Sequence, residues 1–321
     1  MMEKTKPSVS LDKQDNAEYV LTTDMLSKKY GSRYAAKDIN IRIRKGEIYG
    51  LIGRNGAGKT TIMRVLSGLS NATSGSYSLF GKTGRGIKSV MSKVGSLIES
   101  PGIYSNMTAY DNLKIKCIAL GVNKPGYIEQ LLELVGLSQA GRKKAGAFSL
   151  GMRQRLGIAV AIVGDPKLVI LDEPINGLDP QGIVDVRNTL SRLRDEKGMT
   201  VMISSHILDE LGKLADSYGI INEGMLIDEF TNEELHRRSG NYTVISTDND
   251  RKAFELIGGL KGIEAELEEN RIRIKTELSR ENNLVKYLVD NDIFIKEVKT
   301  ESFSLEEYYL SVTRGGSDDN G

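Results

Sequence analysis

The chain has 321 residues, a length that fits two domains with buried cores. Its 44 Lys and Arg nearly balance its 43 Asp and Glu, and the net charge of +1 argues against nucleic acid as a general partner. The one cysteine, Cys117, excludes an internal disulfide and suits a reducing cytosol, and its apolar neighbours predict a buried packing role.

The chain starts with a polar stretch, residues 1–18, which predicts a disordered tail and not a secretory signal. No run of about eighteen apolar residues follows, so we expect no transmembrane helix. If the protein works at a membrane, a separate chain must therefore supply the membrane-spanning part.

The next elements are strands and one helix. Residues 19–22, the alternating stretch 39–44 and residues 74–81 predict strands. Residues 47–52 predict a short apolar strand, and the apolar spacing in 62–66 predicts a helix. The glycine-rich loop between these last two elements is therefore framed by a strand and a helix.

That loop fits the phosphate-binding pattern G-x-x-x-x-G-K-[ST]. Its residues are Gly53, Arg54, Asn55, Gly56, Ala57, Gly58, Lys59, Thr60 and Thr61. Loop N–H groups and the helix N-terminus converge on an anion, and glycine allows the close approach. We expect Lys59 to reach the β- and γ-phosphates and the Thr60 hydroxyl to ligate Mg²⁺. The pattern predicts a nucleoside triphosphate site.

The region 100–165 predicts three helices. The first begins at a capping-box-like Thr108 and ends near Gly121. The second carries an apolar stripe over 128–135, and the third spans 151–163. This part of the chain is therefore expected to be a helical subdomain.

An acidic pair and a histidine follow two continuous apolar runs, 167–172 and 200–205, which predict strands covered on both faces. Ligands bind beyond the carboxyl ends of parallel strands, so we expect Asp172, Glu173 and His206 to meet the phosphate loop at one edge. Asp172 would hold Mg²⁺ or its water, and Glu173 would orient or deprotonate the attacking water.

Beyond Gly240 the pattern changes to a β-α-β-β-α-β order, typical of a ferredoxin-like fold. The predicted elements, ending in one further helix, are at 242–246, 251–257, 263–267, 272–275, 282–289, 293–298 and 305–312. Because no polar cluster with catalytic spacing occurs there, we expect a small accessory or dimerisation domain.

Four motifs resemble those of ABC-type ATPases. Residues 168–174, 177–180 and 205–206 look like the second acidic motif, the D-loop and the H-loop, and residues 148–156 are similar to the signature motif in a degenerate form. The resemblance implies an α/β fold: a P-loop NTPase of ABC type, with a mixed sheet core and a helical subdomain, followed by the small α+β domain.

The resemblance implies an ABC ATPase domain at 19–236, with the helical subdomain at about 100–165, and the pattern beyond Gly240 predicts an accessory domain at 240–313. Residues 314–321 are expected to be a disordered tail. The general resemblance to ABC-type ATPases covers roughly residues 19–236.

The resemblance also assigns binding roles. Ser149 would cap a helix whose N-terminus meets the ATP of a partner subunit, together with Gly151. Tyr30 stands where the family stacks an aromatic ring on adenine, and His206 resembles the residue that contacts the γ-phosphate. Glu99 replaces the family's usual glutamine; its carboxylate can ligate Mg²⁺ but lacks the amide donor.

The context of Glu99, the degenerate signature and the C-terminal end together resemble bacterial transporter ATPases of the bacitracin and lantibiotic type. This implies an ATP- and Mg²⁺-dependent ATPase that drives a separate transmembrane permease, for export of or immunity to peptide antibiotics. The expected assembly is a homodimer, or an ABC heterodimer, at the cytoplasmic face of the cell membrane, without nucleic acid.

Two alternatives belong to other functional classes. The first is a soluble ABC ATPase that acts on ribosomes or DNA; the single ATPase domain, the absence of sustained heptads and the near-neutral charge disfavour it. The second is a nucleotide-binding regulator without hydrolysis, and the presence of Glu173 and His206 argues against it.

Overall fold

The computed structural model describes residues 18–239, 241–260, 262–275, 281–302 and 304–314. Apart from Glu18 and Arg314, the two predicted tails lie outside these ranges, and so does the predicted boundary at Gly240. The chain divides into two compact units between Phe230 and Thr231. Within the described ranges, no helix combines the length and the apolar character needed to cross a membrane.

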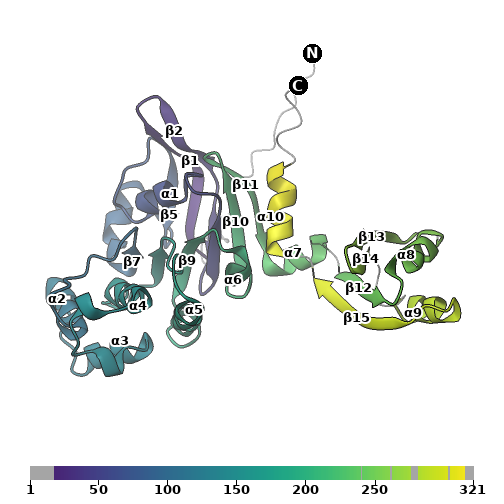
Figure 1. Ribbon diagram of the computed structural model, residues 1–321. Coiled ribbons are helices and arrows are strands. Elements are labelled where there is room, and N and C mark those ends of the chain that lie inside the picture. The colour runs from purple at the N-terminus through teal and green to yellow at the C-terminus, as the bar shows by residue number, and fades with distance from the viewer. Residues whose placement is uncertain (1–17, 240, 261, 276–280, 303, 315–321) are drawn as a thin grey trace, which may run out of the picture. The chain divides into compact units, whose positions relative to one another are not determined.

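The first unit is built on two sheets (Figure 1). The six-stranded sheet has the order β11-β10-β4-β9-β8-β7, and the pairs from β10 to β7 are all parallel. Its strands are β4 (Ile48–Ile52), β7 (Val94–Leu97), β8 (Leu168–Leu171), β9 (Thr200–Ser205), β10 (Ser217–Asn222) and β11 (Met225–Thr231). Every residue of β4, β8 and β9 is buried, as the continuous apolar runs predict.

The second sheet of this unit is antiparallel, with the order β2-β1-β5-β6 and β3 also paired to β1. Its strands are β1 (Tyr19–Tyr30), β2 (Arg33–Ile39), β3 (Arg42–Arg44), β5 (Ser74–Leu79) and β6 (Lys82–Thr83). The helix α1 (Lys59–Leu66) packs its buried residues into the same core cluster as β1, β2 and β5.

The predicted strand at 39–44 is wrong as a single element, because β2 ends at Ile39 and β3 starts at Arg42. The buried Thr23 hydroxyl explains the break: it donates to the Ile39 carbonyl at 2.8 Å and accepts the Ile41 N–H at 2.7 Å. A side chain thus satisfies backbone groups that a strand partner would otherwise bond.

The predicted helical region holds three α-helices, α2 (Ala109–Ala119), α3 (Tyr127–Leu134) and α4 (Leu150–Ala161), which lie together at one end of the unit (Figure 1). Thr108 caps α2 in a capping box with Asp111, as expected from the sequence. The unit also contains α5 (Pro180–Asp195) and the short α6 (Leu208–Gly212).

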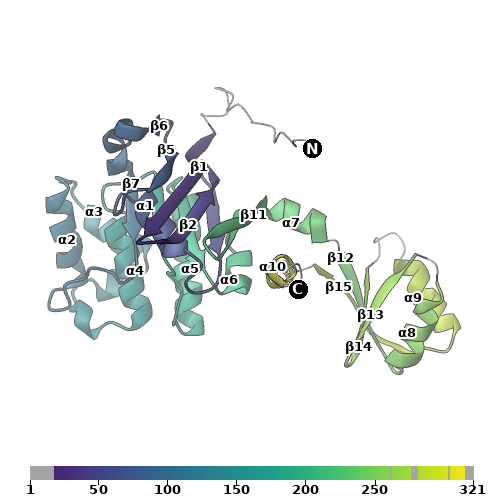
Figure 2. The ribbon, with the colours of Figure 1, turned by 90° about the horizontal axis from the view of Figure 1, so that it is seen from above.

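The second unit contains a four-stranded antiparallel sheet with the order β13-β14-β12-β15. Helices α8 and α9 lie on one side of it (Figure 2) and share its apolar core. The elements are α7 (Asn232–Ser239), β12 (Asn241–Thr247), α8 (Asp250–Gly258), β13 (Glu264–Glu268), β14 (Arg271–Lys275), α9 (Glu281–Asp290), β15 (Ile295–Ser302) and α10 (Leu305–Arg314). The β-α-β-β-α-β order confirms the predicted ferredoxin-like arrangement.

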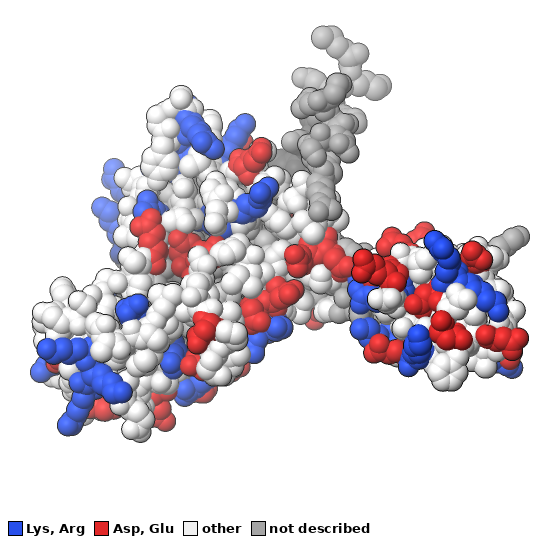
Figure 3. All heavy atoms as spheres, viewed as in Figure 1, with Lys and Arg blue, Asp and Glu red and all other residues white. Residues whose placement is uncertain are grey.

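Acidic and basic side chains are interspersed on the face shown in Figure 3, within each unit. This distribution accompanies the near-zero net charge of the whole sequence. An even mixture of both signs is typical of an ordinary solvated surface.

Candidate nucleotide site

The phosphate loop connects β4 to α1, in the frame of strand and helix that the pattern requires. Gly58 has φ +111°, and a Cβ at this position would collide with the Ala35 carbonyl oxygen. Gly56 also has a positive φ of +82°, with open space around the position of a Cβ. The two glycines thus serve different needs: Gly58 allows both a left-handed backbone and a close approach, whereas Gly56 allows only the backbone conformation.

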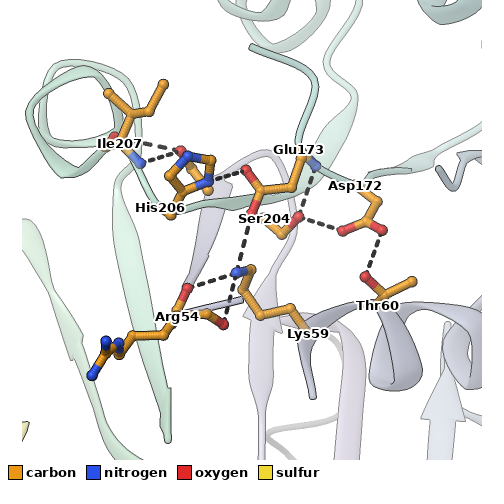
Figure 4. Close-up of polar contacts among 10 residues, drawn as sticks. Arg54, Lys59, Thr60, Asp172, Glu173, Ser204, His206 and Ile207 are labelled. Atoms are coloured by element: carbon orange, nitrogen blue, oxygen red, sulfur yellow. Dashed lines mark hydrogen bonds and ion pairs between the residues drawn. The ribbon is translucent and has the colours of Figure 1, made fainter. Parts of the chain in front are cut away.

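Lys59 is the first residue of α1 and is 5% exposed. Its ammonium donates to the Gly53 carbonyl at 2.6 Å and lies 3.1 Å from Glu173 Oε1. Lys59 therefore connects the phosphate loop to the acidic pair (Figure 4). A small cleft of about 200 Å³ is lined by residues of the phosphate loop, including Lys59, and by Glu173. The Lys59 ammonium therefore borders a space large enough for an anion.

Thr60 and Asp172 meet directly, because the Thr60 hydroxyl donates to Asp172 Oδ2 at 2.8 Å. A hydroxyl and a carboxylate in contact are the oxygen ligands that Mg²⁺ uses together with substrate phosphates. Among the described residues, no group of three His, Cys, Asp or Glu side chains could hold a metal ion alone. The two residues thus fit an ion that a nucleotide's phosphates help to bind.

Glu173 follows Asp172 at the end of β8 and has a left-handed φ of +48°. Its Oε2 atom lies 2.8 Å from His206 Nδ1, and since an ionised carboxylate can only accept, Nδ1 carries the proton in this contact. Oε1 is buried and has no hydrogen-bond partner among the described residues, so its contact with Lys59 is Coulombic. The predicted convergence of Lys59, Asp172, Glu173 and His206 is therefore present.

Sequence reasoning missed Ser204, which lies in β9 between the strands that lead to the phosphate loop and to the acidic pair. Its hydroxyl donates to Asp172 Oδ1 at 2.6 Å and accepts the Glu173 N–H at 2.8 Å. The available signal was a polar residue directly after the apolar run Val201–Ile203 of a buried strand, where a hydroxyl needs a partner.

Ser149 is the N-cap of α4, and its hydroxyl accepts the Met152 N–H at 3.3 Å. The N-terminus of α5 lies beside it, since a Cβ on Gly151 would be 3.5 Å from the Gly182 Cα atom. Asp179 caps α5 by accepting the Gly182 N–H at 3.1 Å. The capped N-termini of α4, which follows the start of the signature motif, and of α5, which follows the D-loop, therefore lie side by side.

Tyr30 ends β1, is 49% exposed, and has the Lys28 ammonium 5.1 Å from its ring centroid. A larger cleft of about 790 Å³ adjoins the phosphate loop and is lined by a second aromatic residue, Tyr34. The other lining residues are Arg33, Ala35, Arg54, Asn55, Gly56, Ala57, Asn222, Glu223 and Gly224. The sequence did not single out Tyr34, because no motif contains it.

Glu99 lies apart from the acidic pair. Its carboxylate is exposed and pairs with Arg64 of α1 at 2.5 Å, and its backbone is left-handed, with φ +64°. Arg64 follows Thr60 by four residues, so the two side chains share a face of α1 one turn apart. The structure thus brings together two of the three expected Mg²⁺ ligands and holds Glu99 on a neighbouring cation.

Comparisons with known proteins agree with this geometry. The family model described as ABC transporter matches residues 36–176. The chain is 42% identical over 302 residues to the bacitracin transport ATP-binding protein BcrA of Enterococcus faecalis, covering 93% of this chain and 98% of that protein. It is 48% identical over 208 residues to the lantibiotic transport ATP-binding protein SrtF of Streptococcus pyogenes, covering 65% of this chain and 89% of that protein.

Among solved structures, cbiO1 from Clostridium perfringens, part of the ABC transporter complex cbiONQ, is similar with a TM-score of 0.61 and 28% identity. The match covers 68% of this chain and 90% of that one. The predicted fold class and the resemblance to bacitracin- and lantibiotic-type ATPases are confirmed. The chain therefore belongs to the ABC transporter family, as an ATP-binding ATPase subunit.

Proposed function

We propose that this chain powers a separate transmembrane permease that exports a peptide antibiotic or protects the cell from one. The observation that carries this proposal is the extent of the similarity to BcrA. An alignment of 302 residues is longer than the first unit, which ends at Phe230. It therefore also includes much of the second unit. The same combination of two units supports a similar transport task.

We assign the binding of the phosphates and of Mg²⁺ to different residues of the site. The phosphate loop binds the phosphates, and Lys59 exchanges its contact with Glu173 for one with the β- and γ-phosphates. Thr60 and Asp172 hold Mg²⁺, with Glu99 as a further candidate ligand once it leaves Arg64. Mg²⁺, when bound, neutralises phosphate charge and orients the γ-phosphoryl group.

Glu173 is the proposed general base. Its Oε1 atom has spare acceptor capacity, so it can take a proton from water when Lys59 turns to the nucleotide. His206 orients the same carboxylate by donating Nδ1–H to Oε2, and as an imidazolium it would also donate Nε2–H to a γ-phosphate oxygen. The proposed adenine platform is Tyr30, although Tyr34 and not Tyr30 lines the larger cleft beside the phosphate loop.

The remaining proposals concern assembly. Two ATPase subunits, identical or related, would enclose two nucleotides, with Ser149 and Gly151 of each subunit at the ATP of the other. The capped N-terminus of α4 supports this role, because its free N–H groups attract a phosphate. Docked on the permease, the dimer would sit at the cytoplasmic face of the cell membrane.

Three experiments test the proposal. In the first, a tagged chain is purified from detergent-solubilised membranes, and we expect a transmembrane permease to co-purify. In the second, cells that produce the wild type or a Glu173→Gln variant are challenged with bacitracin and with a lantibiotic. We expect the variant to lose protection. Co-sedimentation with ribosomes instead of membranes, at two salt concentrations, would support the ribosome-acting alternative and overturn the proposal.

A further inference from the structure

Ser204 lies in β9, between β4, which leads to the phosphate loop, and β8, which leads to the acidic pair. In the parallel register, Ser204 lies opposite Leu51 of β4, and Ile203 lies opposite Leu171 of β8. The residue that follows β8 is Asp172, so Ser204 is its cross-strand neighbour. The Ser204 side chain is 0% exposed, and the three residues before it in β9 are apolar.

The hydrogen bonds of Ser204 have only one possible direction. A backbone N–H must donate, so the Glu173 N–H gives its hydrogen to Ser204 Oγ at 2.8 Å. The hydroxyl then uses its single hydrogen for Asp172 Oδ1, at 2.6 Å. Figure 4 shows the resulting chain, in which Thr60 binds the other carboxylate oxygen of Asp172. Because the Glu173 N–H donates to Ser204 and Ser204 donates to Asp172, these two hydrogen bonds polarise and strengthen one another.

The backbone of Glu173 depends on such a restraint. On a regular strand, the side chains of neighbouring residues point to opposite faces, so Asp172 and Glu173 could not both address one site. The left-handed φ of Glu173 breaks the alternation, and a non-glycine residue adopts such a backbone only at a cost in free energy. The bond from Glu173 N–H to Ser204 lies in the peptide unit between the two carboxylates, where it opposes relaxation of this turn.

We propose that Ser204 is a positioning residue that fixes both carboxylates of the acidic pair. Through Asp172 Oδ1 it directs Oδ2 towards Thr60 and the Mg²⁺ site, and through the Glu173 N–H it keeps the Glu173 side chain beside Lys59 and His206. This inference rests on the proposed roles of Asp172 in Mg²⁺ binding and of Glu173 in hydrolysis.

The test is Ser204→Ala, compared with Ser204→Thr, which keeps the hydroxyl. Loss of a residue that orients a metal-binding carboxylate typically lowers metal affinity or activity by about 10- to 100-fold. We expect Ser204→Ala to lower kcat at least about tenfold and the Mg²⁺ affinity of the protein–AMP-PNP complex by a similar factor. Binding of AMP-PNP in EDTA should remain within about twofold of wild type, and Ser204→Thr should restore both losses.

Thr200→Val is the matched control. Thr200 starts the same strand, is 1% exposed, and its hydroxyl also accepts a backbone N–H, that of Gly46, at 2.9 Å. It lies at the opposite end of β9, so its loss should lower the melting temperature without changing Mg²⁺ affinity. Equal kcat and Mg²⁺ affinity in Ser204→Ala and wild type, or equal losses in Ser204→Ala and Thr200→Val, would overturn the inference.

Asp172→Asn separates this inference from the proposed function. If Asp172→Asn abolishes Mg²⁺-dependent AMP-PNP binding while Ser204→Ala retains it, the positioning role fails and the metal site stands. If Asp172→Asn itself binds Mg²⁺ and AMP-PNP as wild type does, the proposed metal site fails, and the positioning role fails with it.

Discussion

Lys59 and Glu173 form an ion pair, with 3.1 Å between Nζ and Oε1, although one residue starts α1 and the other follows β8. The lysine side chain is 5% exposed and the glutamate 20%, so the contact is shielded from water. The Glu173 carboxylate therefore contacts the Lys59 ammonium, which the phosphate-loop pattern predicts to bind phosphate. If Lys59 binds the β- and γ-phosphates as proposed, nucleotide binding replaces this contact, and variants at both residues test this exchange.

Lys59→Ala removes the charge that should meet the β- and γ-phosphates. We expect kcat/KM for ATP to fall at least about 100-fold, or roughly 3 kcal/mol, as for the loss of one preorganised donor. Phosphate release measures the effect, and Lys45→Ala, which removes an exposed lysine side chain, is the control. An unchanged rate for Lys59→Ala would contradict the assignment of the phosphate loop.

Glu173→Gln keeps the shape of the side chain and removes its charge. Because an amide cannot accept the proton, we expect kcat to fall at least about 100-fold. ATP binding should be retained or tightened, because Lys59 no longer has a competing carboxylate. Equilibrium binding of ATP and size-exclusion chromatography test both effects, and the variant should accumulate as an ATP-bound dimer. Turnover at the wild-type rate would exclude Glu173 as the base.

Gly58→Ala and Gly56→Ala form a graded pair in the phosphate loop. Both place a Cβ on a backbone with positive φ, which costs about 1 kcal/mol or more. Only at Gly58 does the Cβ also meet a backbone oxygen, that of Ala35. We therefore expect Gly58→Ala to lose both stability and ATP binding, and Gly56→Ala to show a smaller loss of stability. Thermal unfolding with and without ATP distinguishes them, and equal losses would contradict the role of the close approach.

The sequence predicted those parts of the fold that depend on local pattern. The apolar runs that became β4, β8 and β9, the capping box of α2 and the hairpin of β13 and β14 carry their signals within a few residues. The convergence of the acidic pair and His206 on the phosphate loop followed from one rule about the carboxyl ends of parallel strands. The split at Asn40 was missed because the Thr23 hydroxyl that causes it is distant in sequence.

The parts of the site that escaped prediction depend on tertiary contacts. Ser204 is identified as a partner of the acidic pair only when the register of β8 and β9 is known. The pairing of Glu99 with Arg64 likewise joins the loop after β7 to α1, and no spacing rule predicts it. Motifs therefore predicted which residues would do the chemistry, whereas the residues that orient them could be identified only from the structure.

At the opposite end of the six-stranded sheet, Glu47 precedes β4 and is 9% exposed. Burial raises the pKa of its carboxyl from the usual 4.5 to about 7, and the Arg44 N–H that Oε1 accepts at 2.7 Å only partly opposes this effect. The folded protein therefore binds the Glu47 proton more tightly than the unfolded chain does.

This shift predicts a pH-dependent stability. The contribution of the protonated Glu47 is complete below about pH 4.5 and is lost as the pH rises through about 7. Glu47→Gln keeps an acceptor for the Arg44 N–H but cannot ionise. At pH 8 we expect the variant to be more stable than wild type, by up to about 3 kcal/mol, since each pKa unit is worth about 1.4 kcal/mol. Thermal or urea unfolding at pH 5 and pH 8 measures the difference, which should shrink at pH 5. A stability gain of the same size at both pH values would mean that the ionisation of Glu47 is not its cause.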